Sequence, residues 1–258
     1  MPVNKDLNIT SDFPVFVGSD KRMTKIECAL IASIFMNTSC SMNIFFMRHS
    51  ENFNWNIGRR YGNPYSGVGW ATDFSCYRFA VPGLCDKFYK GLAIDRALYL
   101  DADMIVLGDL TELFNLHFDD GEVVKTVDGG GMDVILWNIN ERNGFLKSNP
   151  DWLSLDEMKL SGNNFDFYVN KMNSDGKKTD VIPREWNCKD YCDKDSKLIH
   201  FTDMTTQPWK PWPERFSYDK KHKSDSACKE FERYIQIAKD NSIDSKMITS
   251  PSWITTRD

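Results

Sequence analysis

The order of apolar segments in the first 47 residues constrains the fold more than any other feature of this sequence. Residues 14–18 form a short apolar run ending in glycine, which predicts a buried strand. Residues 23–37 repeat apolar side chains at helical spacing, and residues 43–47 form a second apolar run. A strand, a helix and a strand in this order predict a Rossmann-like, doubly wound α/β sheet, whose ligand binds at the carboxyl ends of the strands.

Segments of the same two kinds continue along the chain. Apolar runs predict five more strands, at residues 97–100, 104–107, 122–127, 134–137 and 197–201. Apolar side chains at helical spacing predict helices at residues 73–81 and 226–239. Because no internal repeat or low-complexity linker interrupts the pattern, we predict a single domain over residues 1–258, with its core at about 14–213 and a C-terminal helix and tail at 214–258.

Local signals predict where several elements begin and end. Pro82 predicts the end of the helix expected at residues 73–81. Asp109 and Glu112 have the spacing of a helix N-cap and its capping-box partner. Glycine, asparagine and proline recur in residues 54–70, which predicts a loop there.

The composition is that of a globular protein and gives no reason to expect nucleic-acid binding. Hydrophobic residues make up 41% and aromatic residues 13% of the 258 residues, so a substantial core can form. The net charge of −5 offers no broad attraction for nucleic acid. The basic run at residues 220–223 predicts a solvated surface segment, with contact to an anionic acceptor as the alternative.

The termini and the cysteines favour a cytoplasmic protein without a transmembrane segment. Residues 1–12 are polar and lack the apolar region of a signal peptide, and no apolar run approaches the ~20 residues of a membrane span. Seven scattered cysteines fit reduced thiols better than a disulfide framework. Cys188, Cys192 and His200 are an alternative set of zinc ligands, although their spacing matches no common zinc pattern. A homodimer is left open.

Asp101 and Asp103 directly follow the apolar run at residues 97–100. Residues i and i+2 of an extended strand point to the same side, so these carboxylates converge and would repel one another in a partly buried place. Mg²⁺ or Mn²⁺ resolves that repulsion, and such ions usually bridge carboxylates to substrate phosphates. The alternative is that both aspartates only cap a turn, since aspartate is common in turns.

Two later residues add to the metal interpretation. His200 lies at the end of an apolar run and can supply a nitrogen ligand, although a histidine in such a place is often structural. Lys210 lies between Trp209 and Trp212, which holds its ammonium group in place for a phosphate oxygen. The alternative for this segment is an aromatic surface cluster with a snorkelling lysine.

Taken together, these segments resemble the family 8 glycosyltransferases, which include glycogenin and bacterial lipopolysaccharide galactosyltransferases. The resemblance is carried by residues 99–103, 106–114, 200–201 and 210–212, whose order and spacing agree over about residues 14–213. It implies a GT-A fold in the α/β class, a UDP-sugar donor, Mn²⁺ (or Mg²⁺) as cofactor, and transfer that retains the anomeric configuration.

The resemblance also implies which residues form the metal end of the site. The family's metal ligands correspond to Asp101, Asp103 and His200, with Ala102 between the two aspartates at the donor. The family's diphosphate-contacting lysine corresponds to Lys210.

The donor contacts of the family fall on residues before the two aspartates. The uracil and ribose contacts correspond to four consecutive residues at the end of the first predicted strand, Val17, Gly18, Ser19 and Asp20. The arginine that reaches the donor sugar and phosphate corresponds to Arg78, for which a surface arginine is the alternative.

The sequence departs from the family at the sugar end of the site. Residues 131–133 read Gly-Met-Asp where the family has Asn-Ala-Gly or Asn-Ser-Gly before a strand, and residues 164–166 read Asn-Phe-Asp where it has an Asp-Gln-Asp-like element. Thr202 stands where a glycine is usual. We expect Asp133 or Asp166 to orient the sugar, although a plain turn role for Asp133 is equally open.

The resulting hypothesis is a metal-dependent retaining transferase. It moves a hexose of the glucose or galactose type from a UDP-sugar to a hydroxyl of a glycan, a lipid-linked saccharide or a protein. No unambiguous nucleophile is present, so attack from the face of the leaving group is favoured over a covalent intermediate. The alternatives are a catalytically silent nucleotide-sugar-binding module and a haloacid-dehalogenase-type phosphatase, in which the first aspartate of such a pair is a nucleophile close to the N-terminus.

Overall fold

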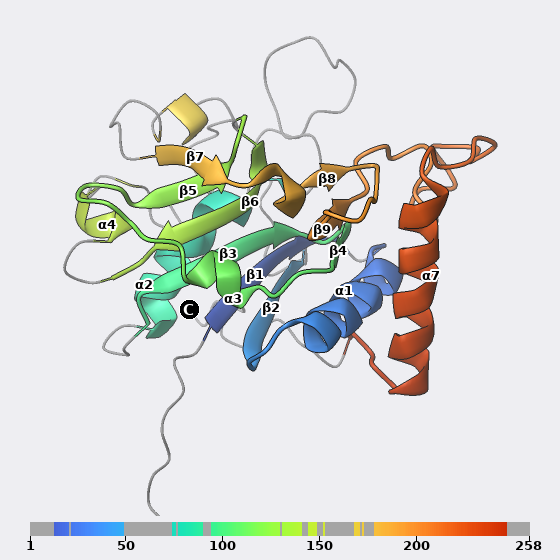
Figure 1. Ribbon diagram of the computed structural model, residues 1–258, viewed down its shortest axis with the longest axis horizontal. Helices are drawn as coiled ribbons and strands as arrows, with labels where there is room; N and C mark the ends of the chain where they lie inside the picture. The colour runs from blue at the N-terminus through green and yellow to red at the C-terminus, as the bar shows by residue number, and fades with distance from the viewer. Residues whose placement is uncertain are drawn as a thin grey trace, which may run out of the picture.

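The structure is a computed structural model that describes residues 13–20, 22–48, 74–75, 77–89, 94–129, 131–140, 144–148, 152, 168–170, 172 and 178–246. Within these residues, the centre of the molecule is a six-stranded mixed sheet in the order β2-β1-β3-β6-β5-β7 (Figure 1). Its strands are β1 (Phe13–Ser19), β2 (Met42–Arg48), β3 (Arg96–Asp101), β5 (Val124–Val127), β6 (Gly131–Asn138) and β7 (Lys178–Ile182). The predicted α/β class with a Rossmann-like mixed sheet is confirmed.

The direction of the strands sets the edge at which a ligand can bind. β2, β1 and β3 run parallel, whereas β6 runs antiparallel to both β3 and β5. In the register of β1 with β3, Gly18 lies opposite Asp101, so the carboxyl ends of the two strands meet. Residues 15–17 of β1 and 97–100 of β3 are fully buried, which explains their continuous hydrophobic runs.

A second, smaller sheet lies beside the large one in the order β4-β9-β8 (Figure 1). It consists of β4 (Met104–Val106), β8 (Cys188–Lys189) and β9 (Leu198–His200). β4 begins only three residues after the end of β3, so the chain passes directly from one sheet to the other through Ala102 and Asp103.

Helices flank the sheets on two sides. α1 (Thr24–Asn37) and α7 (Asp225–Asp240) lie side by side on the right of Figure 1, whereas α2 (Val81–Tyr89) and α4 (Phe145–Ser148) lie on the left. Three shorter elements are the 3₁₀ helices η1 (Tyr77–Ala80) and η2 (Arg184–Trp186) and the single helical turn α3 (Thr111–Phe114).

α7 begins where the sequence provides a cap and packs through its apolar face. The hydroxyl of Ser224 accepts a hydrogen bond from the Ala227 N–H at 3.2 Å, as expected of an N-cap. The buried residues of the helix recur at helical spacing, and the Asn37 side chain of α1 donates a hydrogen bond to the Tyr234 hydroxyl at 2.6 Å. The predicted C-terminal helix is therefore confirmed, and it covers α1 (Figure 1).

The predicted helix at residues 73–81 is wrong in both its position and its end. The chain forms η1 and then α2, and Pro82 lies in the first turn of α2. The first backbone N–H groups of a helix have no partner within the helix, so a proline there costs no hydrogen bond. Proline marks the start of this helix and not the end of another.

Two further boundary predictions need correction. The side chain of Asp109 does accept the Thr111 N–H, at 2.9 Å, but Glu112 pairs with Lys197 of the neighbouring segment and does not complete a capping box. β6 starts at Gly131, three residues earlier than predicted, so residues 131–133 belong to the strand and do not precede it.

Some predictions concern residues that the structure does not describe. The loop expected at residues 54–70 and the Asn-Phe-Asp element at residues 164–166 lie outside the described residues. That residues 1–258 form one domain stays a prediction. Of the helices in the described part, none combines the length and apolar character that a membrane crossing requires.

Candidate active site

The turn between β3 and β4 brings the candidate metal ligands together. Asp101 ends β3 in the large sheet, and the backbone N–H of Ala102 donates a hydrogen bond to the Gly18 carbonyl at 3.0 Å. His200 lies at the end of β9, opposite Met104 in the antiparallel register with β4. The chain bends at Ala102 and Asp103, so the two carboxylates converge through a turn, not along one continuous strand.

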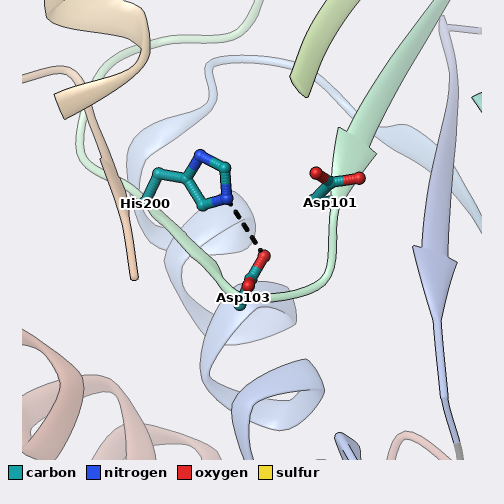
Figure 2. Close-up of side chains that lie close together, drawn as sticks. All are labelled: Asp101, Asp103 and His200. Atoms are coloured by element: carbon teal, nitrogen blue, oxygen red, sulfur yellow. Dashed lines mark ion pairs between the residues drawn. The ribbon is translucent and has the colours of Figure 1, made fainter. Parts of the chain in front are cut away.

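Asp101, Asp103 and His200 form a group with the geometry of a metal site. Each side chain offers one ligand atom, these atoms lie within 4.8 Å of one another, and all three residues are buried. Figure 2 shows the His200 ring pointing toward Asp103, with Asp101 beside them at the end of β3. The distance from His200 Nε2 to Asp103 Oδ1 is 3.3 Å.

The hydrogen bonding of Asp103 fits a bound cation. Asp103 Oδ2 accepts a hydrogen bond from Gln207 Nε2 at 3.2 Å, whereas the buried Oδ1 accepts none from the part of the chain that the structure describes. Buried polar atoms are normally satisfied, so an unsatisfied carboxylate oxygen that faces an imidazole nitrogen suits a metal ion. Two carboxylates and one imidazole are suitable ligands for Mn²⁺ or Mg²⁺, and this fit favours the metal interpretation over a simple turn cap.

Asp101 has a different environment, because protein groups already surround its carboxylate. Arg78 Nη2 lies 3.0 Å from both carboxylate oxygens, and the Tyr99 hydroxyl donates to Oδ1 at 2.6 Å. Burial raises the pKa of Asp101 to about 6, although the Arg78 guanidinium opposes the shift. A Cβ atom at Gly18 would lie 2.1 Å from the Tyr99 hydroxyl, so glycine at this position leaves room for the tyrosine.

Arg78 is an internal residue of the site, and its interpretation as a surface arginine is wrong. It is buried in η1, and its Nε donates to the Ser75 carbonyl at 2.9 Å. Nη1 donates to the Met132 carbonyl at 2.5 Å and lies 3.3 Å from Asp133 Oδ1. A guanidinium placed in this way holds two carboxylates, Asp101 and Asp133, in fixed positions.

Asp133 lies within β6, so it does not have a plain turn role. Its carboxylate has several polar partners. Its Oδ2 lies 2.8 Å from Lys189 Nζ and accepts a hydrogen bond from Asn187 Nδ2 at 3.2 Å. Burial opposes ionisation, but His200, Arg78 and Lys189 outweigh it and hold the pKa of Asp133 well below its usual range. The carboxylate is therefore charged at neutral pH.

His200 has partners on both of its ring nitrogens. Nδ1 lies 2.8 Å from Asn187 Oδ1, and Nε2 faces Asp103. Burial favours the neutral ring, but the carboxylates of Asp103, Asp133 and Asp101 outweigh that effect and raise the pKa of His200 to about 9. The negative potential that attracts this proton would equally attract a divalent cation.

Lys210 lies on a turn that is connected to the metal group. Its side chain is exposed, while Trp209 and Trp212 on either side are buried. Lys210 has a left-handed backbone conformation, with φ of 49°, and its N–H donates to the Gln207 carbonyl at 3.0 Å. Gln207 in turn contacts Asp103, so the turn is anchored to the candidate site. Contact of Lys210 with a diphosphate stays a prediction.

The segment from Val17 to Asp20 lies at the carboxyl end of β1, as predicted. The Ser19 hydroxyl is buried and donates to Glu27 Oε1 at 2.6 Å. Glu27 also binds Arg48 Nη2 at 2.7 Å and the Ser245 hydroxyl at 2.6 Å. This buried carboxylate ties β1, β2 and the segment after α7 together, and it fixes the backbone on which the expected nucleotide contacts lie. Those contacts stay predictions.

Several site residues had not been predicted. Tyr99 precedes Asp101 by two residues on one strand, so their shared face could have been recognised from strand periodicity. Asn187, Lys189 and Gln207 have no such signal, because only the pairing of β8 with β9 and the following turn brings them to the site.

One minor interpretation fails, another holds except at one residue, and one predicted residue is not described. Cys188 Sγ lies 3.4 Å from the Glu185 carbonyl, and within the described ranges Cys188, Cys192 and His200 form no metal-ligand group. The three lysines of the basic run at residues 220–223 are exposed, as predicted, whereas His222 is buried, with Nε2 3.4 Å from Asp190 Oδ1. Asp166 lies outside the described residues.

The fold is that of solved glycosyltransferase structures of the GT-A type. The galactosyltransferase LgtC, solved with donor and acceptor sugar analogues, has a TM-score of 0.51 at 15% identity, with 88% of this chain and 96% of that chain covered. GlyE of Streptococcus pneumoniae TIGR4 has a TM-score of 0.54 at 16% identity, with 94% and 65% covered.

The bifunctional glycosyltransferase WbbM also shares the fold, with a TM-score of 0.52 at 13% identity and 90% of this chain covered. This chain spans 53% of the WbbM chain. No curated protein sequence gives a significant match.

The sequence is also similar to a known family. Residues 78–187 match the family model Glycosyl transferase family 8, which agrees with the resemblance inferred from the motifs. The matched segment contains Arg78, the two aspartates of the turn and Asp133, whereas His200 and Lys210 lie beyond it. The placement of His200 therefore rests on the geometry of the metal group.

Proposed function

We propose that this chain is a metal-dependent retaining glycosyltransferase that transfers a hexose from a UDP-sugar, of the glucose or galactose type, to a hydroxyl of a glycan, a lipid-linked saccharide or a protein. The observation that carries the proposal is the buried group of Asp101, Asp103 and His200, whose ligand atoms lie within 4.8 Å of one another. The family 8 match supports the reaction class, and the fold shared with LgtC, a galactosyltransferase, supports the choice of donor.

Asp101, Asp103 and His200 would hold the ion, with Mn²⁺ or Mg²⁺ as the expected metal. When bound, the metal supplies positive charge to the diphosphate, on which negative charge develops as the sugar departs. Lys210 lies on the turn anchored by Gln207, and we propose that its ammonium group binds the same diphosphate.

Arg78 and Asp133 act on the sugar side of the metal group. Arg78 holds Asp101 in place through paired contacts and also touches Asp133. Asp133 is already engaged by three neighbours, Arg78, Lys189 and Asn187, so it is suited to orient a sugar hydroxyl and poorly suited to attack an anomeric carbon. We therefore propose retention through attack by the acceptor hydroxyl from the face of the departing diphosphate, with Asp133 or Asp166 orienting the sugar.

The proposal is tested by hydrolysis of the donor without acceptor. UDP-glucose, UDP-galactose and their N-acetyl forms are incubated with Mn²⁺, Mg²⁺ or EDTA, and released UDP is measured. We expect turnover of one hexose donor, loss of it in EDTA, and a decrease of at least about 100-fold in D103N, because a preorganised charge at the reacting site is removed. D109N is the control, since Asp109 accepts the Thr111 N–H at the start of α3 and is not one of the three candidate metal ligands.

Unchanged turnover in D103N would refute the proposal. Binding without turnover would identify the silent module instead, and it would appear as a rise in melting temperature with UDP and Mn²⁺ but no released product. The phosphatase alternative needs a free nucleophile at Asp101, and the contacts of that carboxylate with Arg78 and Tyr99 argue against it.

A further inference from the structure

A chain of three polar side chains runs from β6 to the candidate metal group. Asp133 Oδ2 accepts a hydrogen bond from Asn187 Nδ2 at 3.2 Å, and Asn187 Oδ1 lies 2.8 Å from His200 Nδ1. The opposite ring nitrogen, Nε2, faces Asp103. Asn187 is buried and lies between η2 and β8, and it contacts the ring nitrogen of His200 that does not face Asp103.

The chemistry of these groups allows only one direction for the hydrogen bonds. An ionised carboxylate only accepts, so the amide of Asn187 must present its NH₂ group to Asp133. The amide oxygen then faces His200, and an oxygen acceptor requires a proton on Nδ1. A histidine that binds a metal ion is neutral, so His200 would then keep its single proton on Nδ1 and have its lone pair on Nε2, the nitrogen that lies toward Asp103.

The far end of this chain is fixed by charged groups. Asp133 is held by Lys189 Nζ at 2.8 Å and by Arg78 Nη1 at 3.3 Å, so its carboxylate has little freedom to turn away from Asn187. A Cβ atom at Gly131 would lie 3.2 Å from Asn187 Nδ2, closer than most such contacts, so glycine in β6 leaves space for the amide.

We propose that Asn187 is a positioning residue of the metal centre, which holds His200 in the Nδ1-protonated form with Nε2 directed to the ion. The inference rests on the proposed function, because it assumes that Asp101, Asp103 and His200 hold a metal. Partners that orient a metal-binding histidine typically change metal affinity or activity by about 10–100-fold when they are lost.

The test measures Mn²⁺ binding directly, from the electron paramagnetic resonance signal of free Mn²⁺, with UDP present throughout. N187L removes both hydrogen bonds at nearly constant volume, and we expect Mn²⁺ affinity to fall about 10–100-fold. N187D keeps an oxygen acceptor for the His200 Nδ1–H, so we expect affinity within a few-fold of wild type, at lower thermal stability because its carboxylate faces Asp133. N138L is the matched control, since Asn138 lies at the other end of β6 from Asp133.

Equal affinity of N187L and wild type would overturn the inference, and so would equal losses in N187L and N187D. Absence of Mn²⁺ binding in the wild-type protein would overturn both this inference and the proposed function. This outcome differs from a failure of the inference alone, in which the wild-type protein still binds Mn²⁺. If N187L fails to fold, ¹⁵N NMR spectra of the wild-type protein with Mg²⁺ and UDP show which ring nitrogen of His200 carries the proton. We expect the proton of the His200 ring on Nδ1, and a proton on Nε2 would contradict the proposal.

Discussion

The two aspartates of the β3–β4 turn are two residues apart, yet their surroundings differ. On the large-sheet side, Asp101 is bonded to Arg78 and Tyr99, and its carboxylate is fixed before any ligand arrives. On the small-sheet side, Asp103 has one buried oxygen without a hydrogen bond from the described residues, and this oxygen faces His200. The large-sheet side therefore fixes the Asp101 carboxylate, whereas the small-sheet side leaves an oxygen of Asp103 facing the His200 ring.

The two sides also differ in how they are built. The large-sheet side depends on strand pairing and close packing, as the contact of Gly18 with Tyr99 illustrates. The small-sheet side depends on side-chain hydrogen bonds, with Asn187 behind His200 and Gln207 behind Asp103. We expect substitutions on the first side to affect folding stability most strongly, and substitutions on the second side to affect metal binding more than stability.

The largest stability effect is expected from R78M. The change leaves the buried Asp101 carboxylate without its cation, and breaking a buried ion pair costs about 3–5 kcal/mol. R184M is the matched control, because the pair of Arg184 with Asp128 is exposed and such pairs contribute about 0–1 kcal/mol. Urea unfolding measures both variants. Equal losses in the two would mean that Asp101 does not depend on Arg78.

A smaller effect is expected from G18A. The added Cβ would lie 2.1 Å from the Tyr99 hydroxyl, and overpacking of a buried site costs about 1–3 kcal/mol. Combining G18A with Y99F removes the oxygen that clashes, so we expect the double variant to be more stable than the sum of the two single losses predicts. Strict additivity in the unfolding free energies would show that the two residues do not share this space.

The order of the elements was predictable from the sequence because apolar periodicity reports burial directly. β1, α1, β2 and β3 were all predicted close to their observed bounds. The end of a helix at Pro82 was predicted wrongly, because a proline is equally compatible with the first turn of a helix.

The metal group was predictable because its residues end or directly follow apolar runs and match the motifs of the family. Asp101, Asp103 and His200 lie together, as predicted. Asn187 and Lys189 reach Asp133 only because β8 pairs with β9 and β6 lies across from them, and no local pattern in the sequence encodes that contact.

The smallest effect is expected from D190N, on the small-sheet side. Burial would raise the pKa of Asp190, but hydrogen bonds from Thr202 and the Asp203 N–H, together with His222, lower it. A carboxyl with a lowered pKa stabilises the fold above the pKa of an unfolded aspartate, about 3.9, and this contribution is lost as the pH falls through the lower folded value. Asparagine tolerates the left-handed backbone of this residue, with φ of 56°, so the change removes the charge and replaces one acceptor oxygen by an NH₂ group without straining the backbone.

We expect D190N to lose about 0.5–1.5 kcal/mol at pH 7, the usual contribution of such hydrogen bonds. The difference from wild type should narrow as the pH falls below about 4, because the carboxyl takes up a proton first in the unfolded state and only at still lower pH in the folded state. Urea unfolding at pH 7 and at pH 3 measures this difference. A gap that is constant with pH would show that the charge of Asp190 makes no contribution.

The most direct test of the central claim is anomalous diffraction at the manganese edge from crystals grown with Mn²⁺ and UDP. We predict an anomalous peak within bonding distance of Asp103 Oδ1 and His200 Nε2 and beside Asp101, with the diphosphate on the open side of the ion. A well-ordered complex with UDP bound but no peak among these three side chains, or with the peak at another site, would contradict the claim that they form the metal centre of a glycosyltransferase.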